Sequence, residues 1–292
     1  ISWVAIATTC VTSSMFLTAL APNLLAVDLI AKSSGHVITW TEWASVMLPL
    51  MVPLFLITPW LIYVIYPPTQ KKSPEAPAWA AEELKTLGAI TFKEYLMAGL
   101  ATVALILWIF NQEFGLDSTT VAITIVSIMV LANIITWDDL ISNKAAFNIL
   151  IWFASLVAMA SGLQKVGILT WIGTNTQAML SGMSPTALII SLLVLFFILH
   201  YFFASVTAHI TALIPIFMAI AINLLTPEQI IPFTIILAGS LGVMGIITPY
   251  ATGPSPIWYG AGYISQGRWW ALGAIFGALY LGVIILGALI FI

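Results

Sequence analysis

Polar side chains of one kind gather at two places where prolines interrupt an apolar run. Around Pro22 they are Ser13, Ser14, Thr18 and Asn23, and around Pro249 and Pro254 they are Thr248, Thr252 and Ser255. Hydroxyls and the free N–H groups of a helix end can hold an anion without a full positive charge. These residues are therefore suited to binding an anionic solute. Each hydroxyl could instead bond to a carbonyl of its own helix, and only the clustering favours a binding role.

A third polar group lies inside the long apolar run at residues 186–223, where Ser205, Thr207 and His209 follow one another closely. An ionisable side chain inside a membrane is costly and indicates a function by default. His209 could donate to a carboxylate or change its charge with pH. The alternative is a neutral histidine bonded to a neighbouring carbonyl. These three residues complete the predicted substrate-binding set.

The composition is that of an all-α polytopic membrane protein. Of 292 residues, 61% are hydrophobic and only 7% are charged, whereas soluble domains carry about 25% charged residues. Cysteine, histidine and acidic residues form no cluster with catalytic or metal-ligand spacing, so we expect neither an enzyme, nor a metal site, nor a cofactor. The net charge of −3 gives no reason to expect a nucleic-acid partner. A channel would need a continuous lined pore, which two interrupted helices do not favour.

The elements that must position these residues follow from the apolar runs. Residues 1–66 hold a broken helix, with interruptions at 12–14 and 21–23, and one span at 43–66. Residues 67–94 form a polar linker with a predicted surface helix at 82–94. Residues 95–292 hold the remaining elements: spans at 95–110, 118–135 and 145–161, a connector at 164–182, a hairpin at 186–223, a broken helix at about 230–265 and a last span at 269–292.

The helix breaks and the hairpin are predicted from local chemistry. Proline removes a backbone donor and clashes with the preceding turn, and broken helix at membrane depth survives only against protein or a wet cavity. A kinked helix without a ligand is the alternative. The run at 186–223 is about twice a span, yet its middle holds small and hydroxyl residues without charge. This favours a re-entrant hairpin over two ordinary spans.

An internal repeat relates the two broken helices. Ala-Pro-Asn at 21–23 matches Gly-Pro-Ser at 253–255, and each is followed by a short apolar run, a loop and a span. Such repeats are typical of secondary transporters. An inverted repeat would need another hairpin before residue 1, so we expect an N-terminal part to be missing. Six basic residues lie on the same side of the membrane as the 67–94 linker, and two lie on the opposite side. Because cytoplasmic loops carry an excess of Lys and Arg, this distribution predicts that the linker is cytoplasmic.

Three segments resemble the divalent anion:sodium symporter family, namely residues 12–23, 205–209 and 247–260. Within it they are most similar to the bacterial citrate/succinate and tartrate/succinate antiporters and the plastid 2-oxoglutarate/malate translocators. The resemblance implies two inverted repeats, each with a hairpin and a broken helix. It also implies a homodimer whose transport domain moves past a scaffold in an elevator mechanism.

The same resemblance bears on substrate and coupling. Sodium-coupled members carry Ser-Asn-Thr at each hairpin tip, but this chain has Ser205-Val206-Thr207. The missing Asn argues against coupling of transport to sodium. His209 could partly replace the positive charge that a bound sodium ion would supply. The implied function is exchange of di- or tricarboxylates such as citrate, succinate, malate, tartrate or 2-oxoglutarate, with a sodium-coupled dicarboxylate symporter as the alternative. The implied location is the bacterial inner membrane or, alternatively, the plastid inner envelope.

Overall fold

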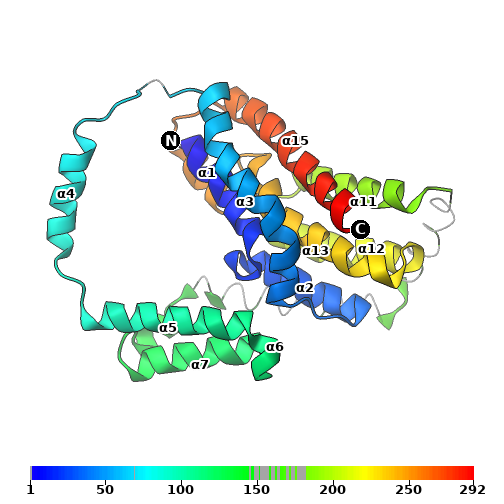
Figure 1. The fold of residues 1–292 in the computed structure, drawn as a ribbon, viewed down its shortest axis with the longest axis horizontal. Coiled ribbons are helices and arrows are strands. Elements are labelled where there is room, and N and C mark those ends of the chain that lie inside the picture. The colour runs from blue at the N-terminus through cyan, green and yellow to red at the C-terminus, as the bar shows by residue number, and fades with distance from the viewer. Residues whose placement is uncertain are drawn as a thin grey trace. The chain divides into compact units, whose positions relative to one another are not determined.

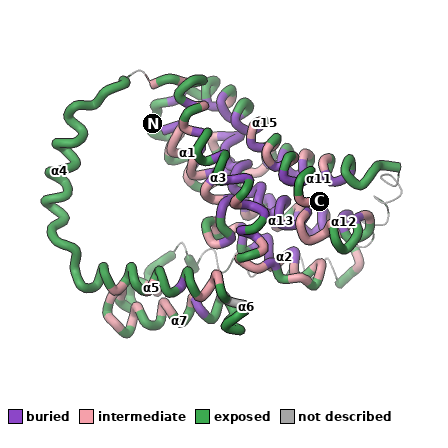
Figure 2. Tube along the Cα trace, in the orientation of Figure 1, coloured by how far each residue is buried: buried purple, intermediate pink, exposed green. Residues whose placement is uncertain are grey.

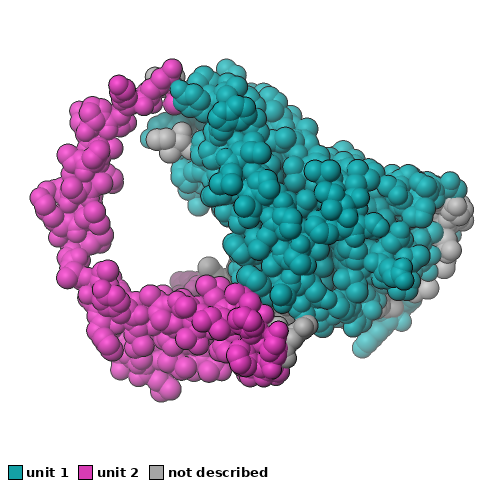
Figure 3. Space-filling model, viewed as in Figure 1, with its two compact units in different colours: residues 1–67, 153–292 teal, residues 68–152 magenta. Residues whose placement is uncertain are grey.

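The computed structural model describes residues 2–68, 70–144 and 182–292, with isolated positions between 146 and 175. Two compact units emerge, residues 1–67 with 153–292 and residues 68–152 (Figure 3). Every regular element in the described ranges is a helix. Six of these helices are long and apolar enough to cross a membrane. The expected all-α polytopic fold is confirmed.

The first broken helix consists of α1 (Ser2–Met15), η1 (Leu17–Ala19) and α2 (Ala21–Ser34). Phe16 and Leu20 are extended and separate the three pieces. Pro22 lies in the first turn of α2, where its missing N–H is not needed. The chain therefore breaks at residues 16–20, just before the interruption predicted at 21–23, and residues 21–23 form the first turn of α2. The other interruption, expected at 12–14, is wrong, because these residues continue α1 to its last turn.

The second broken helix consists of α13 (Pro227–Val243), η3 (Met244–Ile246) and α14 (Pro254–Gly260). Residues 247–253 between them are not helical, as predicted. Figure 2 shows buried residues concentrated on α13, whose residues 233–243 are all buried. This element forms the centre of the larger unit.

The two broken helices run in opposite directions and meet near their interruptions. Trp3, in the first turn of α1, has its ring centroid 5.1 Å from that of Trp269, and Tyr259, in the last turns of α14, lies 5.5 Å from the same ring. The start of α1 and the end of α14 therefore share one end of the unit. In the middle, Ser14 Oγ accepts a hydrogen bond of 3.0 Å from the N–H of Val243. An inverted repeat requires this antiparallel arrangement.

Glycine allows the close crossing of α1 and α13. A Cβ on Gly242 would lie 2.5 Å from Ser14 Oγ and 2.8 Å from the Cys10 carbonyl oxygen. Gly245, one turn further along, faces the Thr252 side chain, and a Cβ there would lie 2.9 Å from Thr252 Cγ2. The absence of a side chain at Gly242 lets α13 approach α1 closely, and at Gly245 it leaves room for the Thr252 side chain within the second interruption.

Two long helices flank this crossing, α3 (Trp40–Ile65) and α15 (Gln266–Phe291) (Figure 1). They correspond to the spans predicted at 43–66 and 269–292. The Arg268 guanidinium lies 5.5 Å from the ring centroid of Tyr66, so the end of α3 and the start of α15 share an end of the unit. Further along α15, the Tyr280 hydroxyl lies 3.3 Å from Thr58 Oγ1 on α3 and donates to the Ala7 carbonyl on α1. This network ties the three helices together.

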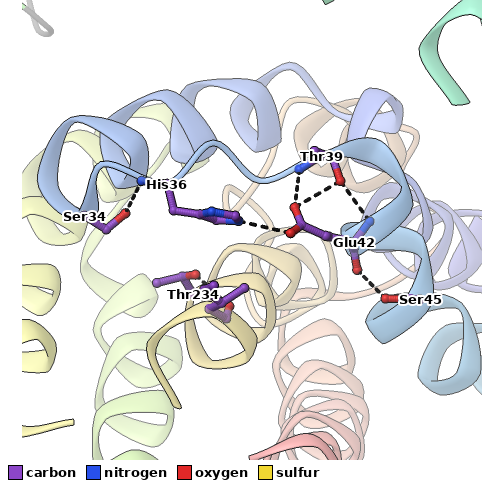
Figure 4. Close-up of polar contacts among 7 residues, drawn as sticks. Ser34, His36, Thr39, Glu42, Ser45 and Thr234 are labelled. Carbon is purple, nitrogen blue, oxygen red and sulfur yellow. Dashed lines mark hydrogen bonds and ion pairs between the residues drawn. The ribbon is translucent and has the colours of Figure 1, made fainter. Parts of the chain in front are cut away.

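A capping box opens α3 and orders the loop from α2. Glu42 Oε2 accepts from the N–H of Thr39 at 2.8 Å, and Thr39 Oγ1 accepts from the N–H of Glu42 at 3.2 Å. The other carboxylate oxygen of Glu42 lies 3.1 Å from Nε2 of His36 (Figure 4). These hydrogen bonds fix the conformation of the loop at residues 35–39, between α2 and α3.

The hairpin is formed by α11 (Pro185–Leu199), η2 (His200–Phe202) and α12 (Val206–Leu224), with a turn at residues 203–205. Helix α12 packs along α2, and α11 packs along α15 (Figure 1). The predicted helix–turn–helix is present. Both arms are long enough to cross a membrane, so the re-entrant character of the hairpin stays a prediction.

The smaller unit holds α4 (Ala76–Leu87), α5 (Phe92–Ile109), α6 (Asn111–Phe114), α7 (Ser118–Leu131) and α8 (Trp137–Ile141). The predicted span at 95–110 corresponds to α5. The linker helix occupies 76–87 rather than 82–94, because Pro77 is tolerated in the first turn and Gly88 ends the helix with φ of 74°.

The span predicted at 118–135 is shorter than expected. Helix α7 has 14 residues, about 21 Å at 1.5 Å per residue, against a hydrocarbon core of about 30 Å. A turn follows, in which Asn133 has φ of 52°. The span predicted at 145–161 and the connector at 164–182 lie largely outside the described residues.

Candidate functional site

The first interruption is capped by side chains from other elements. A helix end leaves carbonyl oxygens without partners. Asn23 Nδ2 donates to the carbonyls of Ser13 at 2.9 Å and Phe16 at 3.3 Å. The indole N–H of Trp43 on α3 donates to the Ser14 carbonyl at 3.1 Å. Side-chain donors thus reach the carbonyls of Ser13 and Ser14 at the end of α1 and the carbonyl of Phe16 just beyond it.

The second interruption is closed by buried hydroxyls. Ser255 Oγ, at the start of α14, donates to the Gly245 carbonyl at 3.2 Å and so bridges the gap between η3 and α14. Thr248 Oγ1 accepts from the N–H of Tyr250 at 3.4 Å. With the Ser14 bond to Val243, these contacts hold the crossing in shape.

Nine of the ten predicted site residues fall into two groups, and His209 belongs to neither. One group is fully buried and bonded within the protein: Ser14, Asn23, Thr248 and Ser255. The other group is partly or fully exposed, and its hydroxyls make no hydrogen bond to any described residue: Ser13, Thr18, Ser205, Thr207 and Thr252. The second group is available to a ligand. The first group shapes the backbone that presents it.

The start of α12 offers further donors beside two of these hydroxyls. Ser205 occupies the N-cap position, but its side chain caps no N–H. The first main-chain bond of the helix runs from the His209 N–H to the Ser205 carbonyl at 3.1 Å. The N–H groups of Val206, Thr207 and Ala208 precede it and have no acceptor among the described residues. They form the positive end of a 19-residue helix, which favours an anion.

His209 lies behind this helix start rather than on its exposed side. Its ring centroid is 4.3 Å from that of Phe196, 4.9 Å from His200 and 5.1 Å from Phe203. The side chain is fully buried, and neither ring nitrogen has a partner among the described residues. A direct contact with substrate would require this aromatic cage to open, and the role of His209 stays a prediction.

Formal charge is absent from the buried residues that surround the two interruptions. The fully buried polar side chains in the described part of the chain belong to Ser, Thr, Asn and His, and none belongs to Lys, Arg, Asp or Glu. The described residues also contain no group of three or more metal-ligating side chains. Dipoles and hydroxyls are therefore the means by which this part of the protein could attract an anion.

Some important residues are not among the predicted site residues. Trp43 caps the first interruption, although its position near a span end suggests only an interfacial aromatic. His200 and Tyr250 bond the hairpin to the second interruption, with Nε2 of His200 2.9 Å from the Ala251 carbonyl oxygen. The sequence signal for Trp43 was an aromatic residue near a span end, and for His200 it was a histidine inside an apolar run. Neither signal identifies the group to which the side chain bonds.

Comparison with known proteins identifies the family. The family described as "Sodium:sulfate symporter transmembrane region" matches residues 1–291. The chain belongs to this family. The resemblance seen in the sequence is thereby confirmed, and membership of a symporter family agrees with the expectation of a transporter rather than an enzyme.

Among its relatives are proteins named L-tartrate/succinate antiporter from Escherichia coli strain K12, Shigella boydii serotype 4 strain Sb227 and Shigella flexneri. Each is 45% identical over 291 residues, which cover 99% of this chain and 59% of the relative. The chain thus spans 59% of the length of these relatives.

Proposed function

We propose that the protein exchanges dicarboxylates across a membrane, with L-tartrate and succinate as the first substrates to test. The observation that carries this proposal is the set of unbonded hydroxyls at the start of α12 and at the two interruptions, together with the unbonded N–H groups at the start of α12. A carboxylate accepts several hydrogen bonds at once, so these donors fit its oxygen atoms. The names of the relatives favour the same substrate class.

The wider features of the proposal follow from the family resemblance. They are an elevator-type alternating access, a homodimer, a location in the bacterial inner membrane and acceptance of tricarboxylates such as citrate. The antiparallel crossing of the two broken helices supports alternating access, because both interruptions lie within one compact unit. The tip sequence Ser205-Val206-Thr207 supports exchange without sodium.

Counterflow in proteoliposomes tests this function with the full-length protein. We expect labelled L-tartrate to enter vesicles loaded with succinate, and to enter empty vesicles far more slowly, with no requirement for sodium. Citrate, malate, 2-oxoglutarate and sulfate define the substrate range in the same assay. Uptake into empty vesicles that requires sodium would instead support the symporter that the family description names.

Thr207→Val tests the proposed carboxylate contact. The substitution keeps the side-chain shape and removes the hydroxyl. A hydrogen bond to a charged group contributes roughly 1.5–3 kcal/mol, so we expect the half-saturating substrate concentration to rise about 12-fold to 160-fold.

Thr211→Val is the matched control. The hydroxyl of Thr211 already bonds to the Thr207 carbonyl of its own helix at 2.9 Å, and its loss is expected to change exchange little. Equal exchange kinetics for Thr207→Val and Thr211→Val would remove Thr207 from the site.

A further inference from the structure

The hairpin turn and the second interruption are joined by two reciprocal hydrogen bonds. A side chain of the hairpin, His200, lies with Nε2 2.9 Å from the Ala251 carbonyl oxygen of the interruption. A side chain of the interruption, Tyr250, donates its hydroxyl to the Tyr201 carbonyl of the hairpin at 3.1 Å. Each segment thus satisfies a main-chain carbonyl of the other.

Helix α15 adds a third component. Trp270 stacks on Tyr201 with ring centroids 6.1 Å apart and an interplanar angle of 13°. The same indole meets Tyr250 edge-on at 6.1 Å and 67°. We name these four residues, His200, Tyr201, Tyr250 and Trp270, the hairpin clasp. It links η2, the interruption at 247–253 and the first turn of α15.

The clasp is continuous with the helix start that carries the unbonded hydroxyls. His200 contacts the ring of His209 at 4.9 Å, and the N–H of His209 bonds to the Ser205 carbonyl. His200 and His209 are both fully buried, whereas Ser205 is exposed. The contact between the His200 and His209 rings thus connects the clasp to the first turn of α12.

We propose that His200 and Tyr250 are positioning residues, which hold the hydroxyls of Ser205 and Thr207 in place beside the second interruption. This inference rests on the proposed function and concerns its binding site. Neither residue needs to touch the substrate. When the clasp is broken, only a fraction of the molecules keeps the donors assembled, and the apparent affinity falls to that fraction of its original value.

The kinetic test uses three variants of the full-length protein in the counterflow assay. His200→Phe and Tyr250→Phe keep the ring and remove the bonding atom. A buried neutral hydrogen bond contributes about 0.5–1.5 kcal/mol, so we expect the half-saturating concentration of L-tartrate to rise by about twofold to twelvefold. The maximal rate should change much less. His200→Gln offers an amide N–H near the position of Nε2 and should restore most of the affinity.

Tyr263→Phe serves as the control, because this tyrosine is 79% exposed. Its kinetics should match those of the wild type. If His200→Phe and Tyr250→Phe also match the wild type, or if they lower the maximal rate without changing the half-saturating concentration, the positioning role is overturned.

A second measurement does not depend on the substrate. Ala251 is fully buried under the clasp, so a cysteine placed there reports its opening. Cys10 and any other cysteine of the full-length protein are first replaced by alanine. We expect a maleimide to label Ala251→Cys about twofold to twelvefold faster with His200→Phe than with His200→Gln. Equal labelling rates would overturn the clasp.

The two tests separate this inference from the proposed function. A wild type without counterflow would reject the proposed exchange, and the labelling rates would still show whether the clasp holds the hairpin. Normal counterflow with equal labelling rates would reject the clasp and leave the exchange intact.

Discussion

Gly242→Ala is expected to destabilise the protein by about 3 kcal/mol, at the upper end of what overpacking of a core usually costs. A Cβ at this position would lie 2.6 Å from the backbone N of Ser14 and 2.8 Å from the carbonyl oxygen of Cys10. These are backbone atoms of a buried helix and cannot rotate away. The crossing of α1 and α13 would have to separate, and the Ser14–Val243 bond would be lost.

The measurement is the thermal unfolding midpoint of the full-length protein in detergent, together with its yield as a monodisperse peak. Gly282→Ala is the matched control, because no atom lies within 4 Å of a Cβ there and alanine is the better helix former. The control should unfold at the wild-type midpoint or slightly above it. A wild-type midpoint for Gly242→Ala would show that α1 and α13 do not cross this closely.

Asn23→Leu is expected to cost about 1–3 kcal/mol of stability. The change removes the amide that donates to the carbonyls of Ser13 and Phe16. The Phe16 carbonyl keeps the N–H of Ala19 as a donor at 3.0 Å, whereas the Ser13 carbonyl is left without its partner, which costs about 1–3 kcal/mol. We expect a lower unfolding midpoint and, as a consequence, weaker exchange.

Asn223→Leu is the comparison, because Asn223 is exposed and bonds only to the Ala219 carbonyl of its own helix. It should behave nearly as the wild type. If Asn23→Leu unfolds at the wild-type midpoint but has lost exchange, Asn23 binds substrate rather than capping α1.

Proline alone does not explain where the helices break. Helix α3 contains Pro49, Pro53 and Pro59 and is continuous, whereas the chain breaks next to Pro22 and Pro254. The prolines of α3 lie on exposed or half-exposed positions among bulky apolar residues. At the breaks, the neighbours are small residues or residues whose side chains bond to a main chain. Both major interruptions were predictable because this chemistry is local.

The partners that close the interruptions were not predictable in the same way. Trp43 is 29 residues from Ser14, and Val243 is 229 residues from it. Nothing near Ser14 in the sequence indicates that its hydroxyl would accept from α13 rather than from a solute. The division of the predicted site into buried caps and unbonded hydroxyls therefore depends on which helices cross, and only the three-dimensional structure supplies that information.

The absence of formal charge among the buried polar residues has an electrical consequence for the proposed exchanger. No buried side chain in the described part of the chain carries a formal charge, so the buried surroundings of the substrate add none to it during a crossing. One-for-one exchange of two dianions would move no net charge over a complete cycle, because any charge fixed on the protein returns to its starting side, and its direction would not depend on the membrane potential. Exchange of a trianion for a dianion would move one elementary charge, worth about 2.3 kcal/mol per 100 mV, and the potential would then set its direction.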